Sequence, residues 1–240
     1  MKKFFILILL ILIFSSRAYA VTEDLTTFTE QDPDGDIAVA NKSCTVTTMT
    51  RDADAALYKD YGASHFVRFT HLLNARWDAE VQTDFKQYIF YGISNTTVGN
   101  YADLDAANVG YGLIWYDDTS PPEYFLRLRN FVDNNTDNFT IPSDTLGVLY
   151  YLEFARSSTT VSLNIYADAA HTNLLDTLSV TYASTAYQYI AVCAGDDTVT
   201  ATSNNISYYV ENLDLKEVVA ALDSYSGRGV GRGIGRGIGR

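Results

Sequence analysis

Apolar and polar residues alternate at every second position through much of this chain, and this period requires extended backbone rather than helix. The alternation is clearest in segments 161–166 and 177–182, where Leu, Val and Ile hold one parity and Ser, Thr and Asn hold most of the other. Successive side chains of a β-strand point to opposite faces of its sheet, so both segments are predicted to be half-buried strands. The residues between them include Asp168, His171 and Asn173 and predict the loop of a hairpin.

Ten further segments are predicted to be strands, because they are rich in Tyr, Thr, Val and Ile and are separated by turn-forming clusters. They are 37–41, 44–49, 55–59, 66–77, 87–94, 111–117, 124–130, 149–156, 187–194 and 206–215. Helical periodicity is nearly absent, and the four prolines, Pro33, Pro121, Pro122 and Pro142, fall in apparent turns. The pattern predicts an all-β fold, a two-sheet antiparallel sandwich.

The N-terminus has the features of a secretory signal peptide. Lys2 and Lys3 precede an apolar run at 4–14, and Ala18-Tyr19-Ala20 provides a small-x-small cleavage pattern. Eleven apolar residues are fewer than the roughly 20 that a membrane-spanning helix requires, and no later segment comes closer. We therefore expect a signal peptide at 1–20, a mature chain that begins near Val21, no transmembrane segment, and a secreted or cell-surface location.

The mature chain divides into one domain at 21–217 and a tail at 218–240 that repeats Gly-Arg-Gly-Ile. Glycine at every second position makes ordering of the backbone costly, so the tail is predicted to be flexible. Its four arginines could dock on an acidic surface, and a plain linker is the alternative interpretation.

Charge excludes one class of partner for the domain. The whole chain has a formal net charge of -12, but seven of its 17 basic residues lie in the signal peptide and the tail. If Asp223 is counted with the domain, ten basic residues then stand against 29 acidic ones, a net charge near -19. Binding to nucleic acid depends on clustered Lys and Arg, so no nucleic-acid partner is expected for the domain.

Cys44 and Cys193 are the two cysteines of the chain. In an exported protein they could form one disulfide, which in the chain-entropy model would stabilise by about 4–5 kcal/mol. Two buried thiols are the alternative, and the sequence leaves both open.

Several segments resemble the concanavalin A-like lectin/glucanase superfamily, and more closely a laminin-G-like branch found in secreted environmental microbial and phage proteins. The resembling segments are 29–35, 55–63, 65–73, 125–127, 150–152, 172–179 and 209–215, of which 172–179 and 210–215 are the most specific. The resemblance implies a jelly roll with ligands on a concave face or on rim loops. Such domains bind glycans, bind proteins or space other modules, so fold alone does not give the function.

The sequence lacks the carboxylate pattern of the glycoside hydrolases in this superfamily. Those enzymes place two acids two residues apart on one strand face, in the pattern E-x-D-x-x-E, so that both can reach one scissile bond. Glu211 and Asp214 are three apart and are expected on opposite faces of a regular strand. Gly62-Ala63-Ser64-His65-Phe66 begins like a nucleophile elbow but lacks the closing glycine. The chain is therefore predicted not to be an enzyme.

Metal binding is not specified by any motif. Asp32-Pro33-Asp34-Gly35-Asp36 repeats oxygen side chains, but an EF-hand starting at Asp32 would need Gly and an acid where Ile37 and Ser43 stand, so a turn is predicted. His65 and His71 would be about 20 Å apart on one strand and could not share a metal ion. Calcium at a rim loop remains an expectation of the resemblance, with no ligands named.

Aromatic and polar side chains on one sheet face are the candidate ligand site. Sugars are held by aromatic rings that stack on their C–H surfaces, beside polar groups that fix orientation. Trp77 and Trp115 are predicted to be core residues. The opposite strand faces carry the candidate ligand-binding residues Tyr116, Arg127, Tyr151 and Glu153, which would form one patch if they align across one sheet. A solvated face without ligand is the alternative.

The sequence thus predicts a secreted, non-catalytic, lectin-like module that binds a glycan or surface polysaccharide. A structural or adhesive surface domain that contacts proteins is the second hypothesis, and a glycoside hydrolase is the third. The sequence does not specify the sugar, the metal or the oligomeric state.

Overall fold

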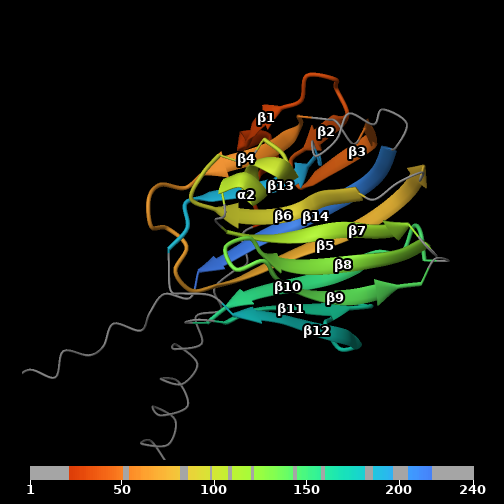
Figure 1. Cartoon of the computed structure of the whole chain (residues 1–240). Helices are drawn as coiled ribbons and strands as arrows, with labels where there is room; N and C mark the ends of the chain where they lie inside the picture. Colours follow the sequence, from red (N-terminus) through yellow and green to blue (C-terminus); the bar gives the residue numbers. More distant parts are fainter. Residues whose placement is uncertain are drawn as a thin grey trace, which may run out of the picture.

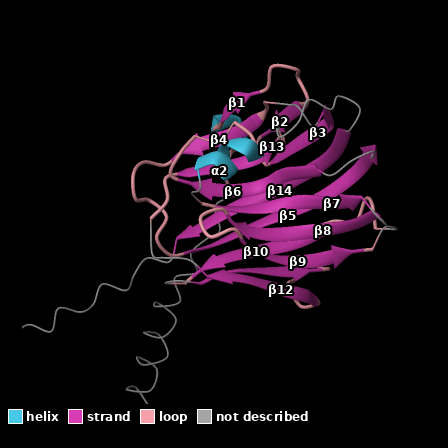
Figure 2. Cartoon of the chain, in the orientation of Figure 1, coloured by secondary structure: helices cyan, strands magenta, loops and turns pink. Residues whose placement is uncertain are grey.

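The computed structural model describes residues 22–50, 54–81, 86–97, 99–107, 110–119, 122–142, 145–157, 160–181, 186–196 and 205–217. Within these ranges the chain forms two seven-stranded antiparallel sheets that pack face to face (Figure 1). Strands dominate the fold, with one short α-helix beside them (Figure 2). The prediction of an all-β, two-sheet antiparallel jelly-roll sandwich is confirmed.

One sheet, called here the β5 sheet, has the strand order β12-β11-β10-β5-β14-β3-β2. Its strands are β2 (Ile37–Ala40), β3 (Ser43–Thr50), β5 (Phe69–Val81), β10 (Tyr150–Arg156), β11 (Thr160–Tyr166), β12 (Leu174–Thr181) and β14 (Asn205–Glu217). The predicted alternation is present residue by residue, because buried and half-buried positions alternate along the whole of β10 and β11.

The other sheet, called here the β6 sheet, has the order β1-β4-β13-β6-β7-β8-β9. Its strands are β1 (Thr29–Gln31), β4 (Ala56–Asp60), β6 (Lys86–Ser94), β7 (Tyr111–Thr119), β8 (Pro122–Asn130), β9 (Asn135–Ile141) and β13 (Tyr189–Ala194). A 3-10 turn η1 (Leu25–Thr27) precedes β1, and helix α2 (Tyr101–Ala107) lies against the outward face of this sheet (Figure 1).

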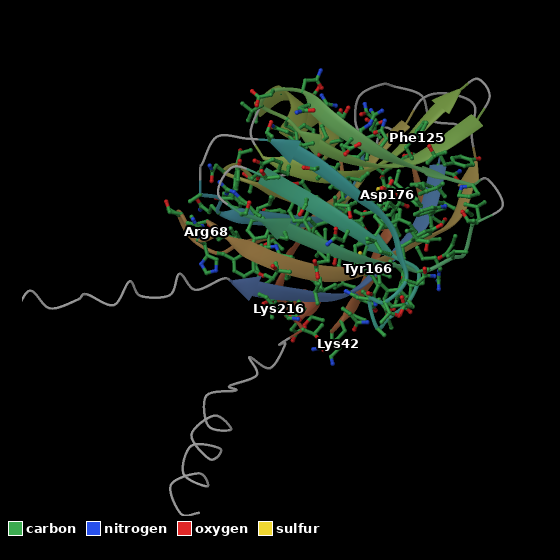
Figure 3. The ribbon with its side chains drawn as sticks, turned by 90° about the horizontal axis from the view of Figure 1, so that it is seen from below. Lys42, Arg68, Phe125, Tyr166, Asp176 and Lys216 are labelled. Atoms are coloured by element: carbon green, nitrogen blue, oxygen red, sulfur yellow. The ribbon has the colours of Figure 1, made fainter. Side chains whose placement is uncertain are left out.

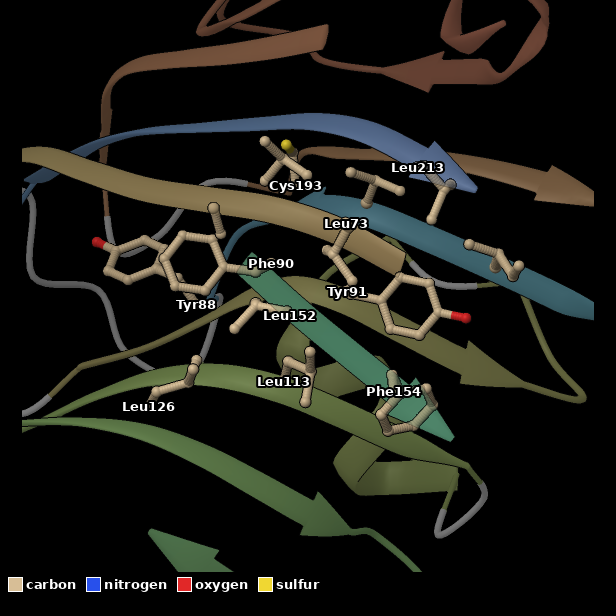
Figure 4. Close-up of a cluster of buried hydrophobic side chains, with 14 of the residues drawn as sticks. Leu73, Tyr88, Phe90, Tyr91, Leu113, Leu126, Leu152, Phe154, Cys193 and Leu213 are labelled. Atoms are coloured by element: carbon tan, nitrogen blue, oxygen red, sulfur yellow. The ribbon is translucent and has the colours of Figure 1, made fainter. Parts of the chain in front are cut away.

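The core fills the space between the sheets and is unusually aromatic. Trp77 stacks on Tyr150 with ring centroids 5.3 Å apart, and Phe90 meets Tyr208 edge to face at 4.7 Å. Figure 4 shows part of this cluster, in which side chains from both sheets interdigitate. Trp77 is a core residue as predicted, whereas the Trp115 side chain lies outside what the structure describes. Complete burial of one such large apolar side chain stabilises by roughly 1.5–3 kcal/mol.

Strand β14 carries an irregularity that the sequence pattern did not reveal. On β14, Asn212 adopts a left-handed φ of 56°, and the pairing with β5 shifts between Glu211 and Asp214. Glu211 pairs with Asn74 and Asp214 pairs with Leu72, and both partners lie on the outward face of β5. The expectation that these two acids point to opposite faces is therefore wrong, because a bulge adds one residue between them.

The Asp32–Asp36 segment is a turn, as predicted. The Asp32 carboxylate accepts hydrogen bonds from the backbone N–H groups of Gly35, Asp36 and Ile37 at 3.1, 3.0 and 2.7 Å. Gly35 has a φ of 80°, which glycine adopts without steric cost. The described residues contain no group of three or more His, Cys, Asp or Glu side chains arranged to hold a metal ion.

Candidate functional site

The four predicted binding residues are divided between the two sheets. Arg127 lies on β8 and Tyr116 on β7, whereas Tyr151 and Glu153 both lie on β10 of the β5 sheet. The outward faces of two packed sheets point away from each other, so the four residues do not form one patch. The side chain of Tyr116 is outside the described part of the structure. Figure 3 shows Phe125 of the β6 sheet and Lys216 of the β5 sheet on opposite sides of the sandwich.

The outward face of the β6 sheet is largely occupied by the protein itself. Tyr101 and Leu104 of α2 pack with Ile89 and Ile114 in a small second cluster of buried residues. Beside them Arg129 donates from Nη2 to Asp105 Oδ1 at 2.5 Å, and its guanidinium lies over the rings of Tyr101 and Phe131. Burial lowers the pKa of Arg129. Helix α2 and the Arg129 side chain therefore cover the centre of this face, which leaves no open sheet surface there for a ligand.

Arg127 lies at the uncovered end of the same face. Its Nε donates to Oδ1 of Asn138 on the neighbouring strand β9 at 2.8 Å. The structure thus gives Arg127 an intramolecular role at the sheet surface, and this role accounts for its position without a ligand.

The outward face of the β5 sheet carries an aromatic and polar row that crosses the strands. Pairing of β11, β10, β5 and β14 places Tyr166, Tyr151, Asn74 and Glu211 side by side at right angles to the strands. The side chains of these residues are half-buried, standing on the sheet with one surface exposed. His171, from the loop after β11, stacks on Tyr166 with ring centroids 4.6 Å apart and lies 6.4 Å from the Tyr151 ring.

A second polar row runs beside the first. Thr177 Oγ1 donates to Asn164 Oδ1 at 2.8 Å, and Asn164 Nδ2 donates to Glu153 Oε1 at 2.9 Å. These bonds fix the Glu153 carboxylate, while its Oε2 has no hydrogen-bond donor from the described residues. One carboxylate oxygen is thus available beside Tyr151, which lies two residues earlier on the same strand face.

We call the residues Tyr151, Glu153, Asn164, Tyr166 and His171 the tyrosine face. Tyr151 and Glu153 were predicted from the sequence. The alternation predicts that Tyr166 and Asn164 lie on the polar face of their strand but does not place them in the site, and for His171 the sequence predicts only a loop position. The signal that could have found them is register, because Tyr166 and Asn164 pair directly with Tyr151 and Glu153.

The loop that presents His171 is fixed by one carboxylate. Asp168 accepts hydrogen bonds from Thr172 N and Oγ1 at 3.1 and 2.8 Å and from Asn173 N at 2.6 Å. The hydrogen bond from the Asn173 backbone, followed by those from Thr172, lowers the pKa of Asp168. His171 adopts a left-handed φ of 54°, a conformation that surrounding contacts must maintain.

Carboxylates elsewhere on this face are engaged by neighbouring groups. Glu211 accepts from Asn74 Nδ2 at 3.0 Å and from Tyr209 OH at 2.9 Å. Asp214 is 6% exposed and lies 3.3 Å from Lys216 Nζ. Arg76 pairs with Asp78, and the hydrogen bond between them raises the pKa of Arg76.

Comparison with known proteins identifies the fold. No family model matches the chain, and no curated protein matches it well enough to count as a relative. Among solved structures, the exoplasmic/lumenal domain of VIP36 bound to Ca²⁺ and Man3GlcNAc has a TM-score of 0.53 at 8% identity, covering 85% of this chain and 90% of that one. A functionally unknown protein from Saccharomyces cerevisiae has a TM-score of 0.50 at 8% identity, covering 82% of this chain and 100% of that one. An alginate lyase from Alteromonas sp. 272 has a TM-score of 0.47 at 10% identity, covering 80% and 94%, which is too low to bear on the fold.

These likenesses show the fold. The chain has a two-sheet jelly-roll fold like that of the VIP36 domain, which is the fold that the resemblance to the concanavalin A-like superfamily implied. The laminin-G-like branch remains a prediction. No helix within the described ranges has the length and hydropathy needed to cross a membrane.

Proposed function

We propose that this protein is an exported, non-catalytic carbohydrate-binding module that contacts cell-surface or matrix glycans through the tyrosine face. The observation that carries the proposal is the Glu153 carboxylate, which Asn164 holds by one oxygen and which leaves the other oxygen open beside Tyr151. A carboxylate oxygen accepts hydrogen bonds from sugar hydroxyls, and the adjacent tyrosine and histidine rings offer surfaces for C–H stacking.

The charge of the face indicates the class of glycan. Arg76 and Lys216 are each paired with an aspartate, and Glu153 supplies an acceptor rather than a donor. An anionic polysaccharide would meet net negative charge on this domain. The ligand class is therefore a neutral glycan, and the VIP36 domain, whose solved form holds Man3GlcNAc, supports this assignment by its fold.

A glycan array with the full mature chain, with and without calcium, tests the proposal. Y151A and E153Q should each weaken binding about tenfold or more, because one removes the stacking surface and the other replaces the open acceptor oxygen by a donor. Gln at position 153 keeps an oxygen for the Asn164 amide, so the fold should be unaffected. Y189A is the matched control, because Tyr189 is a half-buried tyrosine on the β6 sheet.

Three outcomes would contradict the proposal: no glycan bound, unchanged affinity in both variants, or equal loss in Y189A. Calcium dependence is a separate readout. Affinity lost in EDTA would support a calcium-assisted site of the kind that the VIP36 structure contains, although the described residues show no cluster of ligands for it.

Two alternatives each have an observation in their favour. Leu174 and Leu175 at the start of β12 are 51% and 43% exposed, which favours a structural or adhesive domain that contacts protein. Sedimentation showing self-association without sugar, abolished by L174S/L175S, would support it. Glu211 and Asp214 share one face, which is one of the requirements for a pair of glycoside-hydrolase carboxylates, and reducing ends released by the wild type but not by E211Q would support catalysis.

A further inference from the structure

Cys44 and Cys193 meet in the core of the sandwich although they come from different sheets. Cys44 lies on β3 of the β5 sheet, where it pairs with Val39 and Val210. Cys193 lies on β13 of the β6 sheet. Both residues are fully buried in the main core cluster, where burial and then the Cys44 side chain raise the pKa of the Cys193 thiol. Figure 4 shows Cys193 within that cluster.

A break in the alternation turns Cys193 toward the other sheet. Val192 pairs with Tyr91 and Ala194 pairs with Ile89 in an unbroken register, so Cys193 lies opposite Phe90. Cys193 and Phe90 belong to the core between the sheets, as do the adjacent Val192 and Tyr91. Cys193 has a left-handed φ of 58°, which is uncommon for a residue with a side chain and costs on the order of 1 kcal/mol or more.

This geometry suits a covalent link. Two buried thiols that face each other from the two sheets need only a small approach and a rotation of their side chains to reach bonding distance. A two-sheet sandwich accommodates such a link in the immunoglobulin fold, where one disulfide joins the two sheets through the core. The structure shows both cysteines as free thiols.

We propose that Cys44 and Cys193 form a disulfide that joins the two sheets when the chain folds in the presence of a disulfide oxidant. The exchange is balanced: two protein thiols and one small-molecule disulfide give one protein disulfide and two small-molecule thiols. The attacking species is a thiolate, which forms one protein–small-molecule mixed disulfide and is then displaced by the second cysteine.

The bond forms while the chain folds rather than afterwards. Burial raises the pKa of the Cys193 thiol well above its ordinary value, and the hydrogen bond with Cys44 raises it further. A buried, protonated thiol is a poor nucleophile and is closed to the oxidant. The folded reduced protein should therefore resist oxidation, and the folded oxidised protein should resist reduction.

Refolding of the full mature chain in oxidised glutathione tests the proposal. The product is denatured, treated with an alkylating reagent and weighed. We expect no alkyl group and a mass lower by about 2 Da than that of the reduced chain, with one cross-linked peptide pair that contains both cysteines. The oxidised form should melt about 5–15 °C above the form refolded in reductant, given the usual stabilisation by one disulfide.

The double variant C44A/C193A is the control, and its melting temperature should not respond to reductant. Because that variant loses core volume and could fold poorly, the alkylation count of the wild type is the primary readout. Two alkylated thiols after refolding to native circular dichroism in oxidised glutathione would overturn the proposal. A glutathione adduct or an intermolecular dimer in place of the internal bond would also overturn it.

Discussion

Arg156 places a guanidinium group inside the sandwich, where only 3% of the residue is exposed. Its Nη1 donates to the carbonyl oxygen of Phe66 at 3.4 Å, and the guanidinium lies 4.9 Å from the centre of the Tyr187 ring. Nη2 has no hydrogen-bond partner, and no acidic side chain of the described residues pairs with Arg156. Burial of a charge is costly unless an opposite charge compensates for it.

We predict that R156M stabilises the protein by about 1–2 kcal/mol, because Met keeps an unbranched stem and removes the buried charge. Urea denaturation monitored by circular dichroism measures this change. R76M on the exposed sheet face is the control and should shift the free energy of unfolding by less than about 0.5 kcal/mol. A loss of more than about 1 kcal/mol in R156M would show that the contact with Tyr187 outweighs the cost of burial.

Single residues also mark the limit of what the sequence could predict about the site. Tyr151 and Glu153 face outward as the alternation predicts, because β10 is regular along its whole length. Glu211 and Asp214 share a face because Asn212 forms a bulge, and Cys193, with its left-handed φ, lies in the core directly after Val192. A bulge depends on how a strand pairs with its neighbours, and the alternation within one segment carries no such information.

The seam between edge strands β9 and β12 is closed by one carboxylate. Asp137 Oδ1 accepts from the backbone N–H of Asn138 on β9 at 3.0 Å, and Oδ2 accepts from that of Ser179 on β12 at 2.9 Å. The two strands are the edges of different sheets, and Figure 1 shows them side by side. Asp137 therefore joins the sheets and blocks an edge that could otherwise pair with another chain.

We predict that D137A lowers the free energy of unfolding by about 1–2 kcal/mol and speeds hydrogen exchange at the Ser179 amide. D176A is the matched control, because Asp176 accepts only from the next residue, Thr177, at 2.7 Å and does not join the sheets. Urea denaturation and NMR-detected exchange give the two readouts. Equal exchange at Ser179 in D137A and the wild type would show that the seam does not depend on this carboxylate.

The loop between β11 and β12 should respond to acid through Asp168. The hydrogen bonds from Asn173 and Thr172 lower its folded pKa below the ordinary value of 3.8. A carboxylate with a depressed folded pKa stabilises above its unfolded pKa, and this stabilisation is lost as the pH falls through the folded value. We expect the Thr172 and Asn173 amides to lose protection below pH 3.8, with little change between pH 5 and 7.

NMR spectra collected from pH 6 to pH 2 measure this response. In D168N the Thr172 and Asn173 amides should already be less protected at pH 6. Lowering the pH to 2 should cause no further loss of protection in this loop. If the amide signals of the wild type shift with a midpoint above pH 3.8, the ordinary pKa of an aspartate, the sign of the effect is reversed and the prediction is wrong.

Elements that the sequence did not predict have weak local patterns. The polar strand β9 buries only Ile141 fully, because β9 is an edge strand with one open side. Strand β1 has three residues and α2 has seven, which are too short to establish a period. The twelve predicted strands all exist, since each carries an inward apolar face that the sandwich buries.

The molecule as a whole carries a large excess of negative charge. The chain has 29 acidic residues, a net charge of -12 and a pI near 4.5. Four of its basic side chains, those of Lys59, Arg76, Arg129 and Lys216, are paired with acids in the described part of the structure. The remaining carboxylates repel one another across the surface, and this repulsion is stronger in the compact folded state than in the expanded unfolded chain.

Salt should therefore stabilise the protein at neutral pH. At 0.1 M ionic strength the Debye length is about 10 Å, so added NaCl screens repulsion between surface carboxylates more than it weakens close or buried pairs. We predict that the melting temperature at pH 7 rises by a few degrees between about 0.01 and 0.3 M NaCl and then levels off.

EDTA in all samples excludes a contribution from divalent cations. The same titration near pH 4.5, where the net charge approaches zero, provides the internal control and should give a much smaller slope. A flat response at pH 7, or equal slopes at the two pH values, would mean that local hydrogen bonds such as those of Asp137 and Asp168 already offset the repulsion.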